Sequence, residues 1–479
     1  MGAGLYQTAM CHNAIVRVVL ISTYEMGRQP FGLASPAAWL RREGAEVAVF
    51  DLSRQRLDEP AMAAASVVAF YLPMHTATRL ALPVIDRVRA LAPAARLCAF
   101  GLYAPPNADL LRRKGIAAMF GAEFEADLVA FATNSQAEEA LAQPAAPADV
   151  SARAGAPAAK AAVARLAFIA PDRAGLPPPQ LYATLQDGGT RRVVGYTEAS
   201  RGCKHRCRHC PVVPVYDGQF RIVPADIVVS DIAAQVERGV EHVTFGDPDF
   251  FNGPAHALHV VDAVHDRFPT LTYDVTIKVE HLLRHADLLP RLVDTGCRFV
   301  TSAVEAVDNV VLARLDKGHT AADVERAVEV CAGIGLPLAP TFVPFTPWTT
   351  LDGYLELLRT VQRLRLVDAV APIQYAIRLL VSEGSLLLRL PDVQACLRPF
   401  DAAALMYPWV HADPRVDALQ REIQWLVGRG MTADRAGVFG QVQALAAEMT
   451  GRVVPAPLVA PDADFRRTAV PYLNEPWYC

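Results

Sequence analysis

The chain lacks the features of membrane-spanning, secreted and nucleic-acid-binding proteins. No segment reaches the roughly 18 uninterrupted apolar residues that a membrane span needs. The opening "MGAGLYQTAMCHNAIVRVVLIS" has no charged segment followed by a clean apolar run and a cleavage site. The formal net charge is −4 and the pI is about 6.3, whereas nucleic-acid-binding domains are usually basic. We therefore expect a cytoplasmic protein that has neither a membrane nor a nucleic acid as a partner.

The cysteines do not have the distribution of a disulfide framework. There are nine of them, an odd number, and most are scattered along the chain. This pattern suits the reduced cytoplasm and a metal site better than a set of disulfides. The dense cluster is "RGCKHRCRHC", in which Cys203, Cys207 and Cys210 form a C-x3-C-x2-C motif.

Two kinds of metal site fit these three cysteines. A zinc site needs four ligands, usually as two spaced pairs, and the sequence has no second C-x2-C pair, although His205 or His209 could supply a fourth ligand. A [4Fe–4S] cluster held by three thiolates leaves one iron open, and that iron can chelate the amino and carboxylate groups of S-adenosylmethionine (SAM). A further set of basic residues either offsets the thiolate charges or forms a solvated loop face: Arg201, Lys204, Arg206 and Arg208.

The order of apolar runs predicts an α/β chain of two or three domains. Residues 14–135 alternate strand-like and helical patterns, which indicates a doubly wound, parallel, Rossmann-like sheet. Residues 136–192 are rich in Ala and Pro and are interpreted as a linker. In residues 193–390 the alternation resumes with six strand-like runs, the last at 370–381, which predicts a partial (β/α)6 barrel with its site at the strand carboxyl ends. Residues 391–479 are expected to be helical and then irregular.

The C-x3-C-x2-C spacing directly after the first strand of this barrel resembles the radical SAM superfamily. The resemblance implies a [4Fe–4S] cluster on the three cysteines and reductive cleavage of SAM. It also implies a small-molecule substrate and an electron donor such as flavodoxin or ferredoxin. The other class of function that remains open is a zinc-stabilised α/β binding protein.

The resemblance also implies a set of SAM-binding residues near the strand ends. The segment "FGDP" takes the place of the family's segment for the SAM amino group, and "TSAVE" takes the place of a polar pair for the carboxylate and ribose. An ordinary turn, or an outward-facing side chain, is the alternative interpretation at these positions. The candidates are Gly246, Asp247, Pro248, Lys278, Ser302, Glu305, Gln374 and Arg378.

The N-terminal domain resembles the cobalamin-binding domains of B12-dependent radical SAM enzymes. The D-x-H-x-x-G motif that supplies a lower axial histidine is absent, and His75 lies on a different loop. The resemblance therefore implies either cobalamin bound without a protein ligand or a scaffold that holds no corrin.

The closest resemblance is to radical SAM proteins with a CUAEP or CCAEP tail, where U is selenocysteine. Here the last residues are "NEPWYC", so we hypothesise that a selenocysteine codon follows Cys479, which is the candidate substrate thiol. The resemblance implies transfer of the 3-amino-3-carboxypropyl group of SAM to trivalent arsenic, a soft acceptor, as in arsinothricin-type antibiotic biosynthesis. The alternative is a cobalamin-dependent radical SAM methyltransferase.

Overall fold

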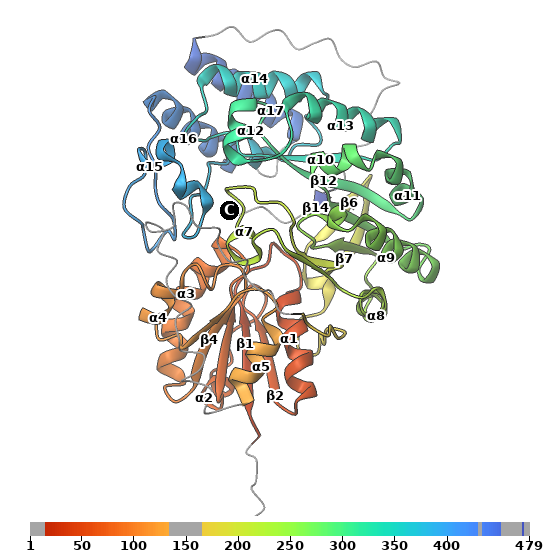
Figure 1. The fold of residues 1–479 in the computed structure, drawn as a ribbon, viewed down its shortest axis with the longest axis vertical. Helices are drawn as coiled ribbons and strands as arrows, with labels where there is room; N and C mark the ends of the chain where they lie inside the picture. Colours follow the sequence, from red (N-terminus) through yellow and green to blue (C-terminus); the bar gives the residue numbers. More distant parts are fainter. Residues whose placement is uncertain (1–14, 134–164, 430–433, 452–471, 474–479) are drawn as a thin grey trace, which may run out of the picture.

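The computed structural model describes residues 15–133, 165–429, 434–451 and 472–473, and Figure 1 shows their arrangement. A parallel sheet with helices on both faces, drawn in red and orange, lies below a second, curved sheet drawn in green and cyan. Helices of the C-terminal region, in blue, lie beside and above the second sheet. Among the helices of these residues, none combines the length and apolarity required to cross a membrane.

The N-terminal sheet is parallel throughout, with the strand order β2-β1-β3-β4-β5. This order is that of doubly wound folds, so the predicted Rossmann-like domain is confirmed. Its strands are β1 (Arg17–Ser22), β2 (Glu46–Asp51), β3 (Val67–Tyr71), β4 (Arg96–Phe100) and β5 (Ala118–Phe120). Its helices are α1 (Phe31–Arg42), α2 (Glu59–Ala63), α3 (His75–Leu91), α4 (Ala108–Arg113) and α5 (Glu125–Thr133).

The continuous apolar runs of this sheet arise because both of its faces are covered. Along β1, Val18 and Leu20 belong to the core on the α1 and α5 side, and Val19 and Ile21 belong to the core on the α3 side. Successive side chains of a strand point to opposite faces, so a strand buried on both faces reads as one unbroken hydrophobic run.

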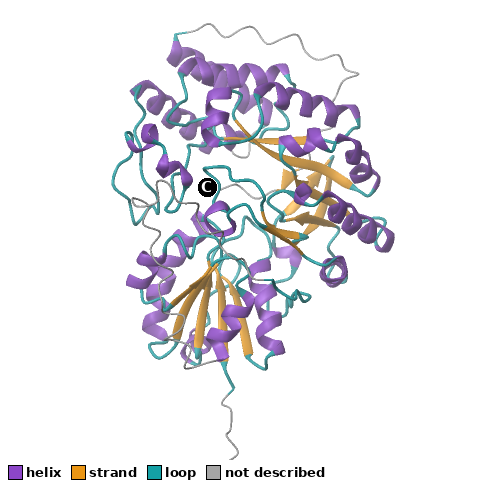
Figure 2. Ribbon diagram, in the orientation of Figure 1, coloured by secondary structure: helices purple, strands orange, loops and turns teal. Residues whose placement is uncertain are grey.

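The second sheet contains five parallel strands that curl into a half-barrel, extended by two antiparallel strands at one edge (Figure 2). In spatial order the strands are β13 (Leu338–Phe342), β12 (Cys297–Glu305), β11 (Thr272–Thr276), β10 (His242–Phe245), β7 (Thr190–Thr197), β6 (Thr184–Asp187) and β14 (Tyr472–Leu473). Helices between the strands are α8 (Ala225–Val236), α9 (Pro254–Arg267), α10 (Val279–Arg284), α11 (Leu289–Asp294), α12 (Asn309–Leu315), α13 (Ala321–Gly333) and α14 (Leu351–Arg363). Short 3-10 helices are η1 (Pro179–Leu181), η2 (Phe250–Asn252) and η3 (Ala286–Leu288).

The predicted sixth barrel strand, at 370–381, is wrong. The 3-10 helix η4 (Pro372–Tyr375) lies there, and a single bridge between Phe345 and Arg378 is all that continues the sheet. Pro372 has no N–H to donate to a strand ladder, which explains why the apolar run does not pair. The interpretation of 136–192 as a linker falls in part outside the described residues, and its last part contains η1 and β6 instead.

The C-terminal region joins the two α/β parts. Leu405 is buried in the core on the α3 side of the N-terminal sheet, and the Ala404 carbonyl oxygen lies 2.7 Å from Nε2 of His75. The long helices pack on the core of the half-barrel. The elements of this region are η5 (Leu386–Arg389), α15 (Pro391–Gln394), α16 (Pro414–Arg429) and α17 (Arg435–Thr450).

Candidate functional site

The cysteine loop begins where the first parallel strand of the half-barrel ends. After β7, the short strand β8 (Ser200–Gly202) pairs antiparallel with β9 (Phe220–Ile222), and the loop and α7 (Val213–Tyr216) lie between them. Gly202 has φ +75°, and a Cβ there would lie 2.3 Å from the Tyr216 ring and 2.5 Å from the Gln219 carbonyl oxygen. Only glycine fits this turn, which leads the chain directly into Cys203.

All three cysteines of the loop are free thiols. Cys203 and Cys207 are buried, and Cys210 is half-buried. Burial raises the pKa of Cys203 to about 11 and that of Cys210 to about 12. Such thiols become thiolates when a metal or cluster binds them, because the bound cation replaces the lost solvation.

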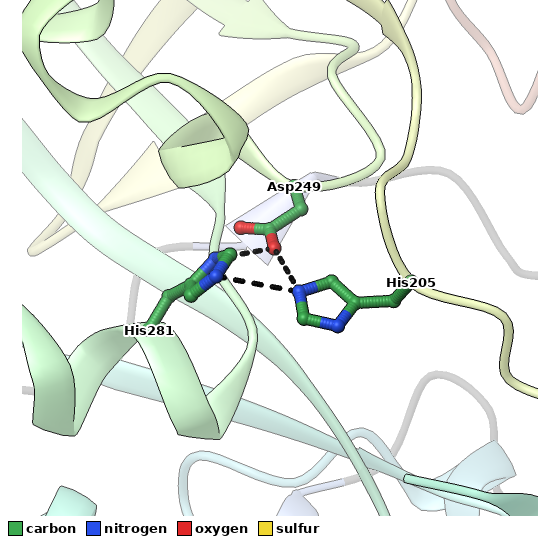
Figure 3. Close-up of side chains that lie close together, drawn as sticks. All are labelled: His205, Asp249 and His281. Carbon is green, nitrogen blue, oxygen red and sulfur yellow. Dashed lines mark hydrogen bonds and ion pairs between the residues drawn. The ribbon is translucent and has the colours of Figure 1, made fainter. Parts of the chain in front are cut away.

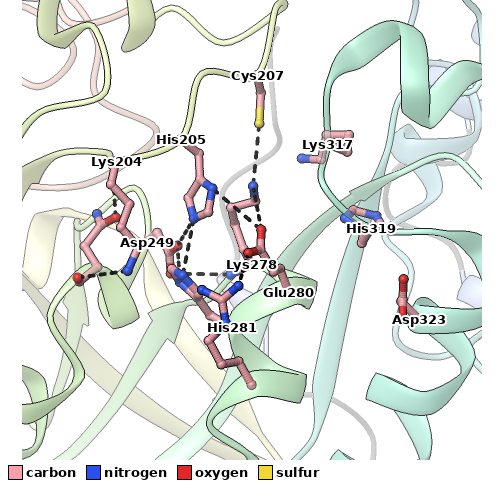
Figure 4. A network of polar contacts seen from close by, with 12 residues as sticks. Lys204, His205, Cys207, Asp249, Lys278, Glu280, His281, Lys317, His319 and Asp323 are labelled. Atoms are coloured by element: carbon pink, nitrogen blue, oxygen red, sulfur yellow. Dashed lines mark hydrogen bonds and ion pairs between the residues drawn. The ribbon is translucent and has the colours of Figure 1, made fainter.

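Two buried lysines flank these thiols (Figure 4). Nζ of Lys278 lies 3.8 Å from Sγ of Cys207, and the Lys278 side chain is 8% exposed. Lys317 is also buried. Although burial acts in the opposite direction, Glu305 and the nearby thiols of Cys207 and Cys210 raise the pKa of Lys317. Each lysine also has a carboxylate partner, Glu280 at 3.9 Å from Lys278 and Glu305 at 3.3 Å from Lys317, and their positive charge beside the thiols favours a group of negative charge there. A three-thiolate iron–sulfur cluster fits this requirement.

The basic residues of the loop itself make other contacts. Arg201 is enclosed by Glu123, Glu125 and Glu198 at 3.7, 2.7 and 2.8 Å. Arg206 pairs with Asp217 at 2.6 Å, Arg208 donates to the carbonyl oxygens of Ala313 and Arg314, and Lys204 donates to that of Asn252. The charge opposite the thiols therefore comes from lysines far away in the sequence.

Two predicted residues of β12 lie close to the cysteine loop. Oε1 of Glu305 lies 3.1 Å from Nε2 of His209 and 3.3 Å from Nζ of Lys317. Although burial acts in the opposite direction, Lys317 and His209 lower the pKa of Glu305 to about 2, so this carboxylate is charged. Oγ of Ser302 is buried and has no hydrogen-bond partner among the described residues, which leaves it available to a bound ligand.

The predicted residues after β10 stabilise the start of the cysteine loop. Asp247 accepts hydrogen bonds from the Ala199 N–H at 2.9 Å and from the Ser200 hydroxyl at 2.5 Å. Burial raises the pKa of Asp247 to about 7. A Cβ on Gly246 would overlap the Tyr196 ring, and Pro248 is half-buried between Asp247 and Asp249.

The two predicted residues of the sixth barrel unit make contacts within the protein. Oε1 of Gln374 accepts a hydrogen bond from the Phe342 N–H at 2.8 Å. Arg378 pairs with Asp417 at 2.7 Å and lies over the Trp409 ring, so it anchors the C-terminal region. Their assignment to a cofactor stays a prediction, and Cys479 lies outside the described residues.

Sequence reasoning missed a group of three side chains beside the loop, drawn in Figure 3. His205 from the loop, Asp249 after β10 and His281 from α10 present ligand atoms that all lie within 4.8 Å of one another. The sequence feature that could have indicated this group is "GDPDF", in which a second aspartate, Asp249, follows Asp247. No short-range sequence pattern links that aspartate to the two histidines.

The carboxyl edge of the N-terminal sheet faces the other side of the cysteine loop. Oγ of Ser22 and Oε2 of Glu25 are buried there without a hydrogen-bond partner among the described residues. Burial, assisted by Glu198, raises the pKa of Glu25 to about 8. A small cavity between the two parts is lined by residues that include Tyr103 and Cys210.

The residues at this edge bear on whether cobalamin can bind there. The orphaned oxygens of Ser22 and Glu25 suit a ligand rich in amide groups, which cobalamin is, so the edge fits the outer side chains of a corrin. His75 hydrogen-bonds the Ala404 carbonyl oxygen and does not serve as an axial ligand in this arrangement.

Comparisons with known proteins agree with this architecture. The sequence model of the radical SAM superfamily matches residues 197–358. The structure is similar to that of the radical SAM methyltransferase TsrM from Kitasatospora setae with cobalamin and a [4Fe-4S] cluster bound, with a TM-score of 0.56 and 16% identity over 91% of this chain and 99% of TsrM. It is also similar to the cobalamin-dependent radical SAM enzyme OxsB with aqua-cobalamin bound, with a TM-score of 0.65 and 12% identity over 91% of this chain and 73% of OxsB. No curated protein matches the sequence.

At these identities the solved structures establish the fold alone. They share the arrangement of a Rossmann-like domain, a curled half-barrel and helical regions, which confirms the predicted fold class.

Proposed function

Residues 197–358 form a radical SAM domain, and we propose that the chain is a radical SAM transferase that uses a [4Fe–4S] cluster to cleave SAM reductively and methylates a small molecule. The observation that carries the proposal is the position of Lys278 and Lys317 beside Cys203, Cys207 and Cys210. Methyl transfer is supported by the similarity to TsrM, which is named as a methyltransferase.

The cluster would be held by Cys203, Cys207 and Cys210, and when bound it supplies an open iron for SAM and the electron that breaks a carbon–sulfur bond. Lys278 and Lys317 offset the charge of the thiolates. Glu305 keeps Lys317 and His209 in place. The unpartnered hydroxyl of Ser302 offers a hydrogen bond to a polar group of SAM.

Cobalamin, as the carrier of the methyl group, would lie between the two sheets. Its amide side chains would meet Ser22 and Glu25 at the edge of the N-terminal sheet. An electron donor such as a flavodoxin or a ferredoxin would supply the electron.

The test is anaerobic reconstitution of the full chain with iron, sulfide and cobalamin, followed by metal and product analysis. We expect about four irons per chain, cobalamin retained through gel filtration, and S-adenosylhomocysteine together with 5′-deoxyadenosine as products from SAM. Zinc in place of iron at the three cysteines would overturn the proposal and favour a zinc-stabilised binding protein.

A second candidate function is favoured by the packing inside the N-terminal domain. The rings of Tyr71, Phe100 and Phe124 stack against one another at 4.8–6.3 Å, and a Cβ on Gly32 would overlap the Tyr71 ring. These rings fill the space between α1, α5 and the sheet. If these rings leave no room for the nucleotide part of cobalamin, SAM itself donates the transferred group.

In that case the transferred group is the 3-amino-3-carboxypropyl group of SAM, and the acceptor is a soft centre such as trivalent arsenic. The products separate the two candidates. 5′-Methylthioadenosine formed with arsenite, in protein that retains no cobalamin, would support this transfer and contradict methylation. If adding arsenite did not change the products formed from SAM, this second candidate function would be contradicted.

A further inference from the structure

The three side chains beside the cysteine loop contact one another in a way that ordinary hydrogen bonding does not explain. Nδ1 of His281 lies 2.6 Å from Oδ2 of Asp249, yet both atoms are buried and neither makes a hydrogen bond of acceptable geometry. Nε2 of His205 lies 3.6 Å from the same Asp249 oxygen and 3.3 Å from Nε2 of His281 (Figure 3). Their nitrogen and oxygen atoms converge on one small region.

The spacing of these atoms is that of metal ligands. Two atoms bound to one zinc ion at 2.0–2.1 Å and at the tetrahedral angle lie about 3.3 Å apart. Nε2 of His205 lies 3.3 Å from Nε2 of His281 and 3.6 Å from Oδ2 of Asp249, which is close to this value, and the 2.6 Å contact of Asp249 is with the other nitrogen of the His281 ring, Nδ1. Imidazole nitrogen favours zinc, iron and related cations over magnesium or calcium, which prefer oxygen alone.

The outer contacts also match those of metal-binding side chains. Nδ1 of His205 faces Oε2 of Glu280 at 3.7 Å, so its Nε2 is the nitrogen turned toward Asp249 and His281. The other oxygen of Asp249, Oδ1, lies within 3.3 Å of the Phe251 N–H and 3.5 Å of the Lys278 N–H. Metal-ligating histidines commonly have their second nitrogen oriented by a carboxylate in this way.

The charges around the three side chains permit a cation there. The carboxyl groups of Asp249 and Glu280 lie beside the imidazoles, and Nζ of Lys278 is directed to Sγ of Cys207 and to Glu280 at 3.8 and 3.9 Å (Figure 4). The nearest cation is thus paired with other anions. Asp249 and His281 are fully buried, and the His205 side chain is 16% exposed, so access is from the side of His205.

We propose that His205, Asp249 and His281 bind one divalent transition-metal ion, separate from the cluster on the three cysteines. Three protein ligands leave a position for water or for a donor atom of the substrate, as in catalytic rather than structural zinc sites. Because His205 lies between Cys203 and Cys207, the ion also ties the middle of the cysteine loop to β10 and α10. The site does not depend on the group that is transferred from SAM.

Zinc is the probe, and the cysteines are loaded first so that they do not compete for it. The full chain is reconstituted anaerobically with iron and sulfide, exposed to excess Zn²⁺, desalted and analysed for both metals. We expect about four irons and about one zinc per chain. In Asp249→Asn and His281→Gln the zinc should fall at least about tenfold, with the iron unchanged.

His285→Gln is the matched control. Its ring centroid lies 5.8 Å from that of His281, but it is outside the group of three, so its zinc content should equal that of the unaltered chain. Unaltered protein without zinc, or variants with undiminished zinc, would overturn the site. If the chain does not take up the expected iron, by contrast, only the proposed function is contradicted.

Because Asp249 and His281 are buried, their variants could unfold, and His205→Gln gives a second measurement. Zn²⁺ should raise the unfolding temperature of the unaltered chain and leave that of folded His205→Gln unchanged. An equal rise in both proteins, or no rise in either, would contradict the proposal.

Discussion

The two sheet edges that face the cysteine loop differ in how their buried charges are paired. Beside the N-terminal edge, Glu123, Glu125 and Glu198 surround the buried Arg201, and burial and Glu198 together raise the pKa of Glu25. At the half-barrel edge, Lys278 and Lys317 face thiols. Buried carboxyl groups that outnumber their cationic partners are stabilised by protonation or by hydrogen-bond donors. A buried cation, in contrast, requires an anion nearby. The two edges are therefore suited to different ligands.

Removing one thiol from the half-barrel edge should have the largest effect. In Cys207→Ala we expect the cluster iron to be lost and SAM cleavage to fall to the uncatalysed background, because two thiolates do not hold the cluster. Iron content and the rate of SAM cleavage measure this. Cys396→Ala, which alters a half-buried cysteine outside the loop, should keep both. Cleavage that survives in Cys207→Ala would refute the cluster assignment.

Removing the central cation of the N-terminal edge should mainly reduce stability. Arg201→Met leaves Glu123, Glu125 and Glu198 buried without their partner, which costs about 3–5 kcal/mol. Arg206→Met is the control, because its pair with Asp217 is partly exposed and is worth about 0–1 kcal/mol. Thermal unfolding of both variants should show a large decrease for the first and little change for the second. Equal decreases would mean that the buried charges are not coupled.

Replacing one cation of the half-barrel edge should reduce activity with little change in stability. Lys278→Met removes a charge 3.8 Å from Sγ of Cys207, an interaction worth about 1.5 kcal/mol or about tenfold in rate. The measurement is the rate of reductive SAM cleavage per cluster. Lys204→Met is a control in the same loop, because Nζ of Lys204 contacts the Asn252 carbonyl oxygen. A rate that is equal in both variants would contradict the role of Lys278.

The smallest effect concerns the pH dependence of stability at the N-terminal edge. The pKa of Glu25 is raised from 4.5 to about 8, mainly by burial, so between these pH values the folded chain holds a proton that the unfolded chain has released. Its contribution to stability is therefore complete below about pH 4.5 and is lost as the pH rises through about 8. Glu25→Gln should flatten this decline and raise the unfolding temperature at pH 8 by a few degrees. Glu43→Gln, an exposed change, should keep the slope of the unaltered chain.

The fold was predictable to the extent that it depends on local pattern. The unbroken run of β1 indicated a strand covered on both faces, and the structure confirms the doubly wound sheet around it. The same criterion failed at 370–381, where an equally apolar run forms η4 and packs without a partner strand. Whether an apolar segment pairs as a strand depends on the neighbour it meets, which its own residues do not specify.

The candidate site was predictable where its residues are close in sequence. The spacing of Cys203, Cys207 and Cys210 indicated the cluster loop. The basic residues beside them, for which a counter-charge or a solvated loop face was expected, make other contacts, and the cation that faces the Cys207 thiol is Lys278, 71 residues away. His281 reaches His205 across 76 residues, and no local pattern connects them.

By itself, the sequence determined the alternation of strands and helices and the three cysteines on one turn, because periodicity and short-range spacing govern both. Only the tertiary structure decided which charges face the thiols and which imidazoles meet a carboxylate. Parallel strands place their carboxyl ends along a common edge, and there residues distant in the chain become neighbours in a medium of low polarity. In such a medium each buried charge needs a partner, and the folded arrangement alone determines which one it has.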